Sequence, residues 1–428
     1  MARNGARVAV GVLIRWGRTS RSGLAVAWRR TPALVPCVMA ASVALAGCAG
    51  GRVPRAPAKA LVTGHLASVS ISRSGKTEWA VGATALTAHA LPRTLIVKGT
   101  ARVWVQVTSP SVMGVQHNSA GADNELTAVS AVSAGDAWAV GYYTPYGRRA
   151  ASSEGESWPL ILHWNGSLWT RVRANVFDAG WVTLDAVSAD AANNVWVVGA
   201  YRGAYPRVFH WNGATWQSVS LEGALGAGGL YGASITAVQA LGSANVWMVG
   251  SSGGGLPLAL HFNGVAWESV AVPRSGAPGV GGSLTSVTIG PSGLGWASGV
   301  VGSTTGVLDY WNGKAWSSDS AAAVGASGAI RSVSVCPSSL ATGLQGWAVG
   351  GVGSRKAAIL KLAGPGWTPV ATPRVSGGAL TLNAVVSNLS CGGEVVGSYV
   401  KSGASPIGPS PLVLSWISGK WVQEPVVS

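Results

Sequence analysis

Three histidines share one position in a recurring motif and are the residues that most resemble a metal-ligand set. His163 and His210 each begin a His-Trp-Asn-Gly-x-x-Trp stretch, and His261 begins a nearly identical one. Three imidazoles can hold a zinc ion. Equivalent positions in successive repeats diverge in space, however, so we predict that each histidine has a structural role in its own repeat. We expect no metal ion and no cofactor.

Acidic residues could supply glycosidase chemistry, which needs a carboxyl group on either side of the scissile bond. The chain has only 15 Asp and Glu, and charged residues make up 11% of it. Glu154 and Glu156 lie near Arg148, but Ser188 to Trp196 only approximates the Asp box of sialidases, Ser-x-Asp-x-Gly-x-Thr-Trp. No nucleophile elbow or phosphate-binding loop stands out. We therefore predict a protein that is not an enzyme, and the alternative is a glycan-active hydrolase or lyase that uses those loop residues.

Tryptophan is abundant, with 21 Trp against 3 Phe, and its spacing reveals an internal repeat. Trp-Ala-Val-Gly or a close variant begins at Trp79, Trp138, Trp196, Trp247, Trp296 and Trp347, and Glu394 to Gly397 is a seventh copy without the Trp. A second signature ends each unit with a closing tryptophan, at Trp104, Trp169, Trp216, Trp267, Trp316, Trp367 and Trp421. Seven units of about 50 residues result, a period typical of propellers and other repeat folds.

Each unit contains signals for four short antiparallel strands. An alternating run of small residues precedes the Trp-x-Val-Gly strand, a third strand ends in Asn-Gly, and a fourth begins near the closing Trp. Asn-Gly predicts a tight hairpin in which both turn residues have positive φ. Seven such units predict an all-β fold, a seven-bladed β-propeller of four-stranded antiparallel blades. The expected blades are residues 65–108, 125–174, 183–220, 234–272, 283–320, 329–371 and 381–425.

The order of these signals resembles the kelch family, in which a glycine-ended second strand is followed by an aromatic residue, a tight turn and a closing Trp. The resemblance covers roughly residues 65 to 425 and implies a kelch-like propeller. The sequence departs from the kelch pattern because it lacks the double glycine. The sequence does not show how the ring closes, because the repeats start in a first strand and end in a fourth.

Loop lengths and aromatic residues distinguish one face of the predicted propeller. Segments between the second and third strands vary in length and are longest in units one, two and seven, which become neighbours in a closed ring. Variable loops on a rigid scaffold often carry binding residues, and Tyr, Trp and Arg are enriched at binding hot spots. After Cys48, only Trp158 and Trp181 lie outside the tryptophan repeat, and both belong to this face. The predicted binding-face residues are Tyr143, Tyr146, Arg148, Arg149, Trp158, Trp181, Tyr201, Arg202, Tyr205, Arg207 and Tyr399.

Residues 1–47 have the features of a lipoprotein signal peptide. They contain seven Arg and no acid, and an apolar run ends in Leu45-Ala46-Gly47 before Cys48. Leu-Ala-Gly-Cys resembles the bacterial lipobox, which implies cleavage before Cys48 and lipid attachment to its thiol. The Gly, Pro and Ala content of residues 48–62 predicts a flexible tether, and 63–428 is the predicted propeller. We expect an exported protein that is anchored to the cell membrane on its extracytoplasmic side.

Two cysteines remain in the predicted propeller. Cys336 and Cys391 fall near the turns between first and second strands of adjacent blades. Because an exported protein meets an oxidising environment, a disulfide between them is possible if their Cα atoms come within about 7 Å.

Together these observations favour a ligand- or protein-binding or scaffolding module at the bacterial cell envelope, with an envelope protein or glycan as its partner. The formal net charge of +15 falls to +8 without the signal peptide, and the remaining basic residues are scattered singly. Nucleic acid is therefore not an expected partner. We predict a monomer that reaches the membrane only through its lipid anchor.

Overall fold

The computed structural model describes residues 62–85, 91–100, 102–113, 122–145, 156–177, 180–273, 280–302, 304–319, 328–338, 343–352, 356–363, 366–375, 378–400 and 408–428. All of these belong to the compact unit Ala58–Ser428. The predicted signal peptide, Cys48 and nearly all of the predicted tether lie outside the described residues. Within the described ranges, no helix is long and apolar enough to cross a membrane.

Seven antiparallel sheets, here named blades 1 to 7, each contain four consecutive strands, named A to D in chain order. Blades 1 to 3 contain β1 (Gly64–Ile71), β2 (Glu78–Thr84), β3 (Thr94–Thr100), β4 (Val103–Val107); β5 (Asp123–Ser133), β6 (Asp136–Thr144), β7 (Trp158–Trp164), β8 (Trp169–Arg171); and β9 (Val182–Ala191), β10 (Asn194–Tyr201), β11 (Tyr205–Trp211), β12 (Trp216–Val219).

Blades 4 to 7 contain β13 (Ser234–Gly242), β14 (Asn245–Ser251), β15 (Pro257–Phe262), β16 (Trp267–Val270); β17 (Gly282–Ile289), β18 (Gly295–Val301), β19 (Thr305–Trp311), β20 (Trp316–Asp319); β21 (Ile330–Val335), β22 (Gln345–Val352), β23 (Lys356–Ala363), β24 (Gly366–Val370); and β25 (Leu380–Ser387), β26 (Gly393–Tyr399), β27 (Ser410–Ile417), β28 (Lys420–Glu424). Three short helices, η1 (Asn175–Phe177), α1 (Glu222–Leu225) and η2 (Ala227–Gly229), lie in the connections before and after blade 3.

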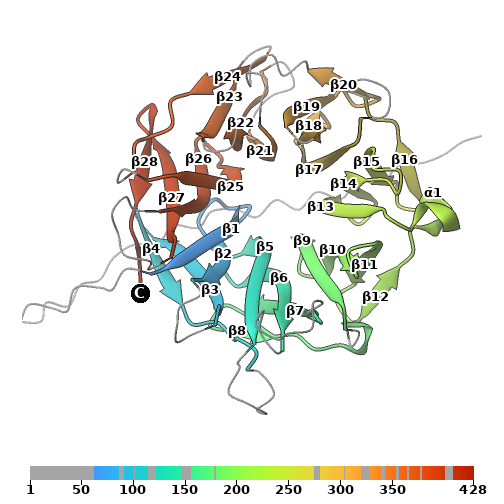
Figure 1. Cartoon of the computed structure of the whole chain (residues 1–428), viewed down its shortest axis with the longest axis horizontal. Helices are drawn as coiled ribbons and strands as arrows, with labels where there is room; N and C mark the ends of the chain where they lie inside the picture. Colours follow the sequence, from blue (N-terminus) through green and yellow to red (C-terminus); the bar gives the residue numbers. More distant parts are fainter. Residues whose placement is uncertain are drawn as a thin grey trace, which may run out of the picture. The chain divides into compact units, whose positions relative to one another are not determined.

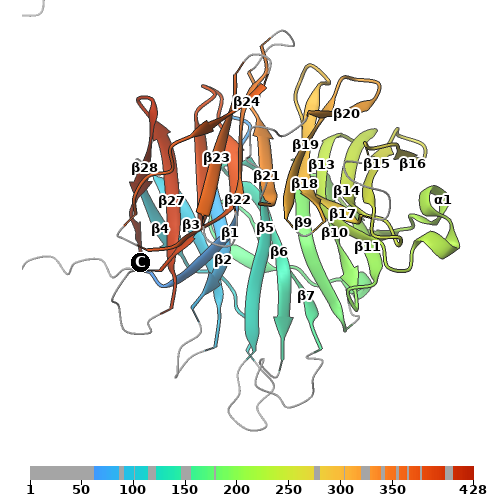
Figure 2. The same ribbon diagram turned by 45° about the horizontal axis from the view of Figure 1, so that its top comes forward.

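The blades form a ring in which strand A of each blade is innermost (Figure 1). Each blade packs against the next one along the chain, and β1 of blade 1 packs against β25, β26 and β27 of blade 7. Helix α1 projects at the outer rim (Figure 2). The arrangement confirms the predicted all-β, seven-bladed β-propeller.

The ring is closed by the last residues of the chain, which the sequence had not indicated. Strand β29 (Val426–Val427) pairs in parallel with the outermost strand of blade 1, so that Val426 lies opposite Trp104. The backbone N–H of Trp104 donates to the carbonyl of Pro425 at 2.9 Å. Blade 1 thereby gains a fifth strand from the other end of the chain.

The glycine that ends each Trp-x-Val-Gly motif is required by a close approach of strand A. Strand A of blade 2 has a β-bulge between Leu126 and Ala128, and a Cβ on Gly141 would lie only 2.0 Å from the carbonyl oxygen of Glu125. No side chain fits such a gap. The same backbone contact recurs at the corresponding glycines Gly82, Gly199, Gly250, Gly299, Gly350 and Gly397.

The Asn-Gly hairpins differ from the prediction in one respect. In blade 2, Trp164 pairs with Trp169, and the intervening loop has Gly166 at a φ of 98° but Asn165 outside the positive-φ region. Instead, the side-chain oxygen of Asn165 accepts hydrogen bonds from the N–H groups of Ser167 and Leu168, each at 3.1 Å. The expectation that both turn residues have positive φ was wrong, because the asparagine stabilises the turn through its side chain.

Most neighbouring blades are joined by a pair of perpendicular indoles. Trp247 of blade 4, for example, lies 5.7 Å from the closing Trp316 of blade 5, with an angle of 85° between the ring planes. Aromatic pairs prefer such edge-to-face geometry. The same arrangement joins Trp79 to Trp169, Trp138 to Trp216, Trp196 to Trp267, Trp296 to Trp367 and Trp347 to Trp421.

Polar side chains of strand A accept hydrogen bonds from backbone N–H groups on strand A of the next blade. The hydroxyl oxygen of Ser130 in blade 2 accepts a hydrogen bond from the backbone N–H of Ala189 in blade 3, at 2.9 Å. An innermost strand would otherwise leave such N–H groups unpaired. Equivalent bonds join Ser70 to Ala131, Ser188 to Ala240, Gln239 to Ile289, Thr288 to Val335 and Ser334 to Ser387.

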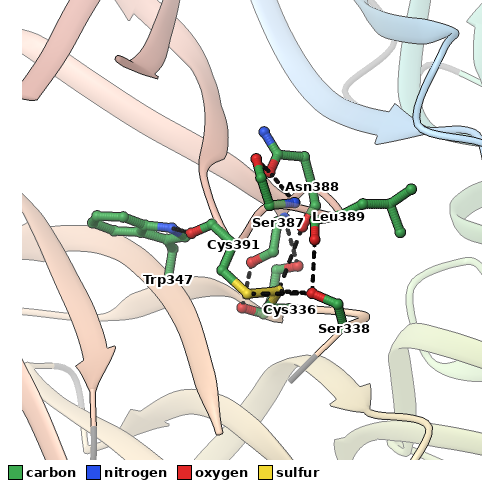
Figure 3. The surroundings of a disulfide bond; sticks show 9 residues. Cys336, Ser338, Trp347, Ser387, Asn388, Leu389 and Cys391 are labelled. Carbon is green, nitrogen blue, oxygen red and sulfur yellow. Dashed lines mark hydrogen bonds between the residues drawn. A yellow bond between two sulfur atoms is a disulfide. The ribbon is translucent and has the colours of Figure 1, made fainter. Parts of the chain in front are cut away.

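A disulfide joins blades 6 and 7. Cys336 follows β21 and Cys391 precedes β26, and their Cα atoms lie 5.0 Å apart (Figure 3). Around it, the hydroxyl of Ser338 donates to the carbonyl of Leu389 at 2.7 Å, and the indole N–H of Trp347 donates to the carbonyl of Cys391 at 3.2 Å. A crosslink between residues 55 positions apart typically adds about 2–4 kcal/mol to the free energy of unfolding.

Candidate functional site

Aromatic and arginine side chains gather where β10 of blade 3 turns into β11. The turn is shorter than the sequence suggested, because β10 continues to Tyr201 and β11 already begins at Tyr205. Tyr201 and Tyr205 pair directly across the two strands. Residues expected in a loop therefore lie at strand ends, where the sheet fixes their backbone. The turn lies on the side of the ring that carries the B-to-C connections, here called the B–C face.

The rings and guanidinium groups at this turn alternate. The guanidinium carbon of Arg202 lies 4.7 Å from the ring centre of Trp181 and 5.6 Å from that of Tyr201. Arg207 lies 5.1 Å from the Tyr201 ring. These distances fall within the range of cation–π attraction. We name the group the blade-3 cluster, which comprises Trp181, Tyr201, Arg202, Tyr205, Arg207 and Tyr231.

Two members of the blade-3 cluster have a strained backbone. Trp181 has a φ of 66° and Arg202 a φ of 51°, a region that bulky side chains rarely adopt. The backbone N–H of Arg202 donates to the carbonyl of Trp181 at 2.7 Å, which ties the two strained residues together. Arg202 and Gly203, with a φ of 64°, are the two central residues of the tight turn closed by the bond from Ala204 N–H to the Tyr201 carbonyl, and such a turn requires positive φ at both. The Trp181 conformation lies outside this turn and costs of order 1–3 kcal/mol.

The outer part of the cluster faces solvent. Tyr231, from the connection between blades 3 and 4, is 65% exposed and lies 5.4 Å from the ring of Tyr205, which is 40% exposed. Among the described residues, neither Arg202 nor Arg207 forms an ion pair with a carboxylate. The cluster therefore presents accessible rings and unneutralised positive charge on the same surface.

A pocket of about 270 Å³ lies next to the cluster, at the outer part of blade 2. Its wall includes Tyr143 at the end of β6 and Trp158 at the start of β7, which pair with each other. Arg171, at the end of β8, donates from its Nη2 to the Tyr143 hydroxyl at 3.2 Å. We name it the blade-2 pocket, lined by Tyr143, Trp158, Pro159, Ile161, Arg171, Val172, Arg173, Ala174 and Phe177.

The two parts are joined through the backbone. The N–H of Val182, next to Trp181, donates to the carbonyl of Ser157, next to Trp158, at 3.0 Å. The chain segments that carry Trp158 and Trp181, the two tryptophans outside the repeat, are therefore bonded directly to each other. The blade-2 pocket and the blade-3 cluster are therefore neighbouring candidate sites whose segments are tied together by this bond.

The remaining predicted binding-face residues do not join this surface. Tyr399 is only 9% exposed and packs in the core between blades 6 and 7. It lines a separate pocket of about 260 Å³ with Val62, Gln423 and Glu424. Tyr399, the last residue of β26, therefore lies apart from the blade-2 pocket and the blade-3 cluster, and its assignment to the binding face stays a prediction. Tyr146, Arg148 and Arg149 lie outside the described residues, as does Glu154.

Sequence reasoning missed Arg171, Arg173 and Phe177, which line the pocket. Their signal was weak because they follow the closing Trp169 and look like the end of an ordinary fourth strand. The alternation Trp-Thr-Arg-Val-Arg does place both arginines on the same side of that segment, which could have indicated them.

The three histidines of the repeat are held within their own blades. Nε2 of His163 lies 2.8 Å from the carboxylate of Asp136, and His210 and His261 pair in the same way with Asn194 and Asn245. Each imidazole also stacks on the strand B tryptophan of its blade, at ring-centre distances of 4.2 to 4.4 Å. These contacts are those of a structural residue that each repeat requires.

The buried acids with altered pKa values are spread around the ring. Burial raises the pKa of Asp185 to about 6 and that of Asp309 to about 7, in blades 3 and 5. Burial also raises the pKa of Glu394 in blade 7 to about 8. The 260 Å³ pocket lined by Tyr399 also contains Glu424 in its wall, but Glu394 and Glu78 do not line it. In the described part of the chain, no group of three or more His, Cys, Asp or Glu is placed to hold a metal ion.

Glu156 is the one predicted catalytic carboxylate that the structure describes. A Cβ added to Gly180 would lie only 2.0 Å from Oε1 of Glu156. The carboxylate is therefore next to Gly180 and close to Trp181, the following residue.

These features define a seven-bladed β-propeller with an aromatic and cationic surface on one face. No protein-family model and no curated protein sequence matches the chain. Solved structures similar to it include YCF48 bound to a D1 peptide (14% identity, TM-score 0.49, covering 84% of this chain and 96% of that one). Others are the fucose-specific lectin from Aleuria aurantia (17%, 0.46, 70% and 94%) and the GH74 xyloglucanase from Xanthomonas campestris (13%, 0.49, 83% and 58%). Similarity at these levels concerns the fold and identifies neither ligand nor activity.

Proposed function

We propose that this protein is an exported, lipid-anchored β-propeller that acts as a binding or scaffolding module at the bacterial cell envelope. Its contact surface comprises the blade-2 pocket and the neighbouring blade-3 cluster. The observation that carries the proposal is the alternation of rings and guanidinium groups on this exposed surface, where Arg202 lies 4.7 Å from the Trp181 ring and Arg207 5.1 Å from the Tyr201 ring.

The composition of the surface agrees with a binding role. Tyr, Trp and Arg give large contact areas at a low entropic cost, because their side chains are held by stacking before the ligand arrives. Arg202 is fixed between Trp181 and Tyr201, and Tyr205 is supported by Tyr231. The surface is therefore organised in advance, which favours affinity.

Photo-crosslinking can test the proposed face. We would place benzoylphenylalanine at Tyr231, and at Val265 as the matched control, since Val265 is 90% exposed in the C–D turn of blade 4 on the opposite face. In cells, we expect a specific adduct from position 231 that disappears when Arg202→Ala and Tyr205→Ala are added. Adducts that form equally at position 265, or that survive both substitutions, would contradict the proposed face.

The lipid anchor has its own test. Cys48→Ala should leave the protein unlipidated and move it out of the membrane fraction, because the thiol is the proposed attachment point. Metabolic labelling with a fatty-acid analogue, followed by fractionation, measures both effects. Unchanged membrane retention with no label in the wild-type protein would contradict the anchor without touching the proposed binding face.

The alternative, a glycan-active hydrolase or lyase, predicts turnover. Incubation of the full chain with a panel of polysaccharides should yield no products if the protein only binds its partner. Products that disappear in Glu156→Gln or Glu154→Gln, with the fold intact, would instead establish the enzymatic function.

A further inference from the structure

The blade-2 pocket has the dimensions of a site for one small chemical unit. Its volume of about 270 Å³ is just below the range of roughly 300–1,000 Å³ that holds drug-sized ligands. Rings form much of its wall, and one of them is rigidly supported. Phe177 lies 4.9 Å from Phe209 and 5.2 Å from Trp216, in edge-to-face contacts with blade 3.

Two arginines give the pocket its charge. Arg171 stacks 4.8 Å from the Tyr143 ring and uses one of its five donors on the Tyr143 hydroxyl. Arg173 is exposed, and no Asp or Glu is among the described residues that line the pocket. Neither arginine forms an ion pair with a carboxylate in the described ranges. Planar guanidinium groups in this state bind carboxylates in a bidentate manner.

The strands that line the blade-2 pocket help to decide between a peptide and a sugar as its ligand. A peptide that docks on a strand edge relies on free backbone donors and acceptors. Trp158 and Pro159 of the wall come from the inner strand β7, where proline has no N–H to donate, and the edge strand β8 contributes the Arg171 side chain. Recognition by rings and guanidinium groups suits a cyclic ligand that has apolar C–H faces and a carboxylate, which describes an acidic sugar.

We propose that the blade-2 pocket binds a carboxylated sugar unit of an acidic glycan, and that the following units lie across the blade-3 cluster. In this arrangement Arg171 and Arg173 bind the carboxylate, and Trp158 and Tyr143 contact the sugar ring. Arg202 and Arg207 supply positive charge where the next sugar units would lie. Each guanidinium group already stacks on a ring, Arg202 on Trp181 and Arg207 on Tyr201. This inference rests on the proposed binding face and names the class of ligand for it.

Calorimetric binding of an octagalacturonate to the full chain tests the proposal. We expect binding by the wild-type protein and at least about tenfold weaker binding of the carboxyl-reduced, neutral octamer, since a hydrogen bond to a charged group contributes roughly 1.5–3 kcal/mol. Arg173→Gln should weaken octagalacturonate binding by a similar factor. Because Arg171 also supports Tyr143, the exposed Arg173 is the better first variant.

A matched control and a competing ligand complete the experiment. Lys314→Gln removes one exposed charge from the C–D turn of blade 5 on the opposite face and should leave the affinity unchanged. Equal affinity for the neutral octamer, an unaffected Arg173→Gln variant, or no binding of octagalacturonate would overturn the proposal. Tighter, Arg173-dependent binding of an oligoglutamate would overturn it in favour of an acidic peptide.

Failure of this inference is distinguishable from failure of the proposed function. If position 231 cross-links to a partner while octagalacturonate does not bind, the face remains and the ligand class is wrong. If neither is observed, the face itself is wrong.

Discussion

Six of the seven interfaces between blades are built alike, and the seventh, between blades 7 and 1, is different. At the six, a strand B tryptophan packs edge-to-face against the closing tryptophan of the next blade, at ring-centre distances of 4.7 to 5.7 Å. At the seventh, which we call the closing seam, Glu394 takes the place of that tryptophan. The comparison shows which contacts recur at every blade interface and which occur only where the ring closes.

The closing seam collects ionisable groups. The hydroxyl of Ser415 donates to the Glu394 carboxylate, and the indole N–H of Trp104 donates to Oε2 of Glu424 at 3.0 Å. Burial raises the pKa of Glu394 to about 8, and the nearby charges of Glu78 and Glu424 add to the shift, although the bond from Ser415 opposes it. Burial, together with Glu424, also raises the pKa of Glu78.

The inner strands show the same exception. Six interfaces carry a hydrogen bond from a strand A backbone N–H to a polar side chain of the preceding blade, such as Ser334 with Ser387. The corresponding position at the closing seam is Val386, which packs against the apolar cluster of Leu66 and Val69. Asn383 does reach across and donates to the carbonyl of Leu66 at 2.8 Å.

The closing seam has its own strand pairing in place of the indole pair and of the inner N–H bond, and it keeps only the outer repeated contact from Asn383 to Leu66. Strand β29 joins the two ends of the chain, which no internal interface requires. An interface that has its own strand pairing no longer needs the indole pair, and carboxyl groups can occupy its place. The comparison thus predicts that the two kinds of interface respond to different perturbations.

Loss of a strand B indole should have the largest effect. We expect Trp247→Ala to lower the free energy of unfolding by about 3–5 kcal/mol, because the side chain is buried against His261, Trp311 and Trp316. Chemical denaturation measures the change, and Trp247→Phe, which keeps a ring, should lose clearly less. Equal losses in the two variants would show that the edge-to-face contact is not what joins the blades.

The stability of the closing seam should depend on pH through the buried carboxyl group of Glu394. Because the folded state raises the pKa of Glu394 from 4.5 to about 8, it keeps a proton that the unfolded chain releases. The contribution of Glu394 to stability is therefore present at low pH and is lost as the pH rises from 4.5 to about 8, by about 2.5 kcal/mol between roughly pH 5 and pH 7.

Glu394→Gln should remove this part of the slope. Asp185 and Asp309 also have raised pKa values, but they titrate equally in both proteins, so the difference between the two curves isolates Glu394. Thermal unfolding at a series of pH values provides the measurement. Identical slopes in both proteins would mean that Glu394 does not sense the pH at the closing seam.

Weakening β29 should open the seam locally. Val426 is 6% exposed, and Val426→Ala should cost about 2 kcal/mol, whereas the half-buried Val427 should tolerate the same change better. Hydrogen exchange should accelerate in β1, β4 and β28 and remain slow in blades 3 to 5. Uniform acceleration around the ring would argue against a separate closing seam.

The smallest effect concerns the inner hydrogen bonds. Ser130→Val should cost about 1 kcal/mol, because it leaves the backbone N–H of Ala189 without its acceptor. Ser130→Thr keeps the hydroxyl and serves as the control in the same denaturation experiment. If both variants match the wild type, water replaces the hydroxyl at these positions.

Much of the fold was accessible from the sequence because each blade repeats the same local requirements. The tryptophans at two fixed positions, the glycine beside the strand A bulge and the Asn-Gly hairpins recur often enough to show where four strands begin and end. The closure by Val426 and Val427 was missed because two residues after Pro425 carry no period. The candidate site was found only in part for a similar reason, since Arg171 and Arg173 resemble the end of an ordinary strand.

The sequence by itself therefore determined the number of blades, the order of strands and which tryptophans serve the repeat. Only the tertiary structure decided that a backbone bond joins the neighbours of Trp158 and Trp181, that Tyr399 is buried, and that three glutamates interact near the closing seam. Repeated local signals report contacts within a blade and with its neighbour, because every repeat makes them. Contacts made once, between distant segments, depend on how the ring brings the two ends together, and no periodic pattern encodes them.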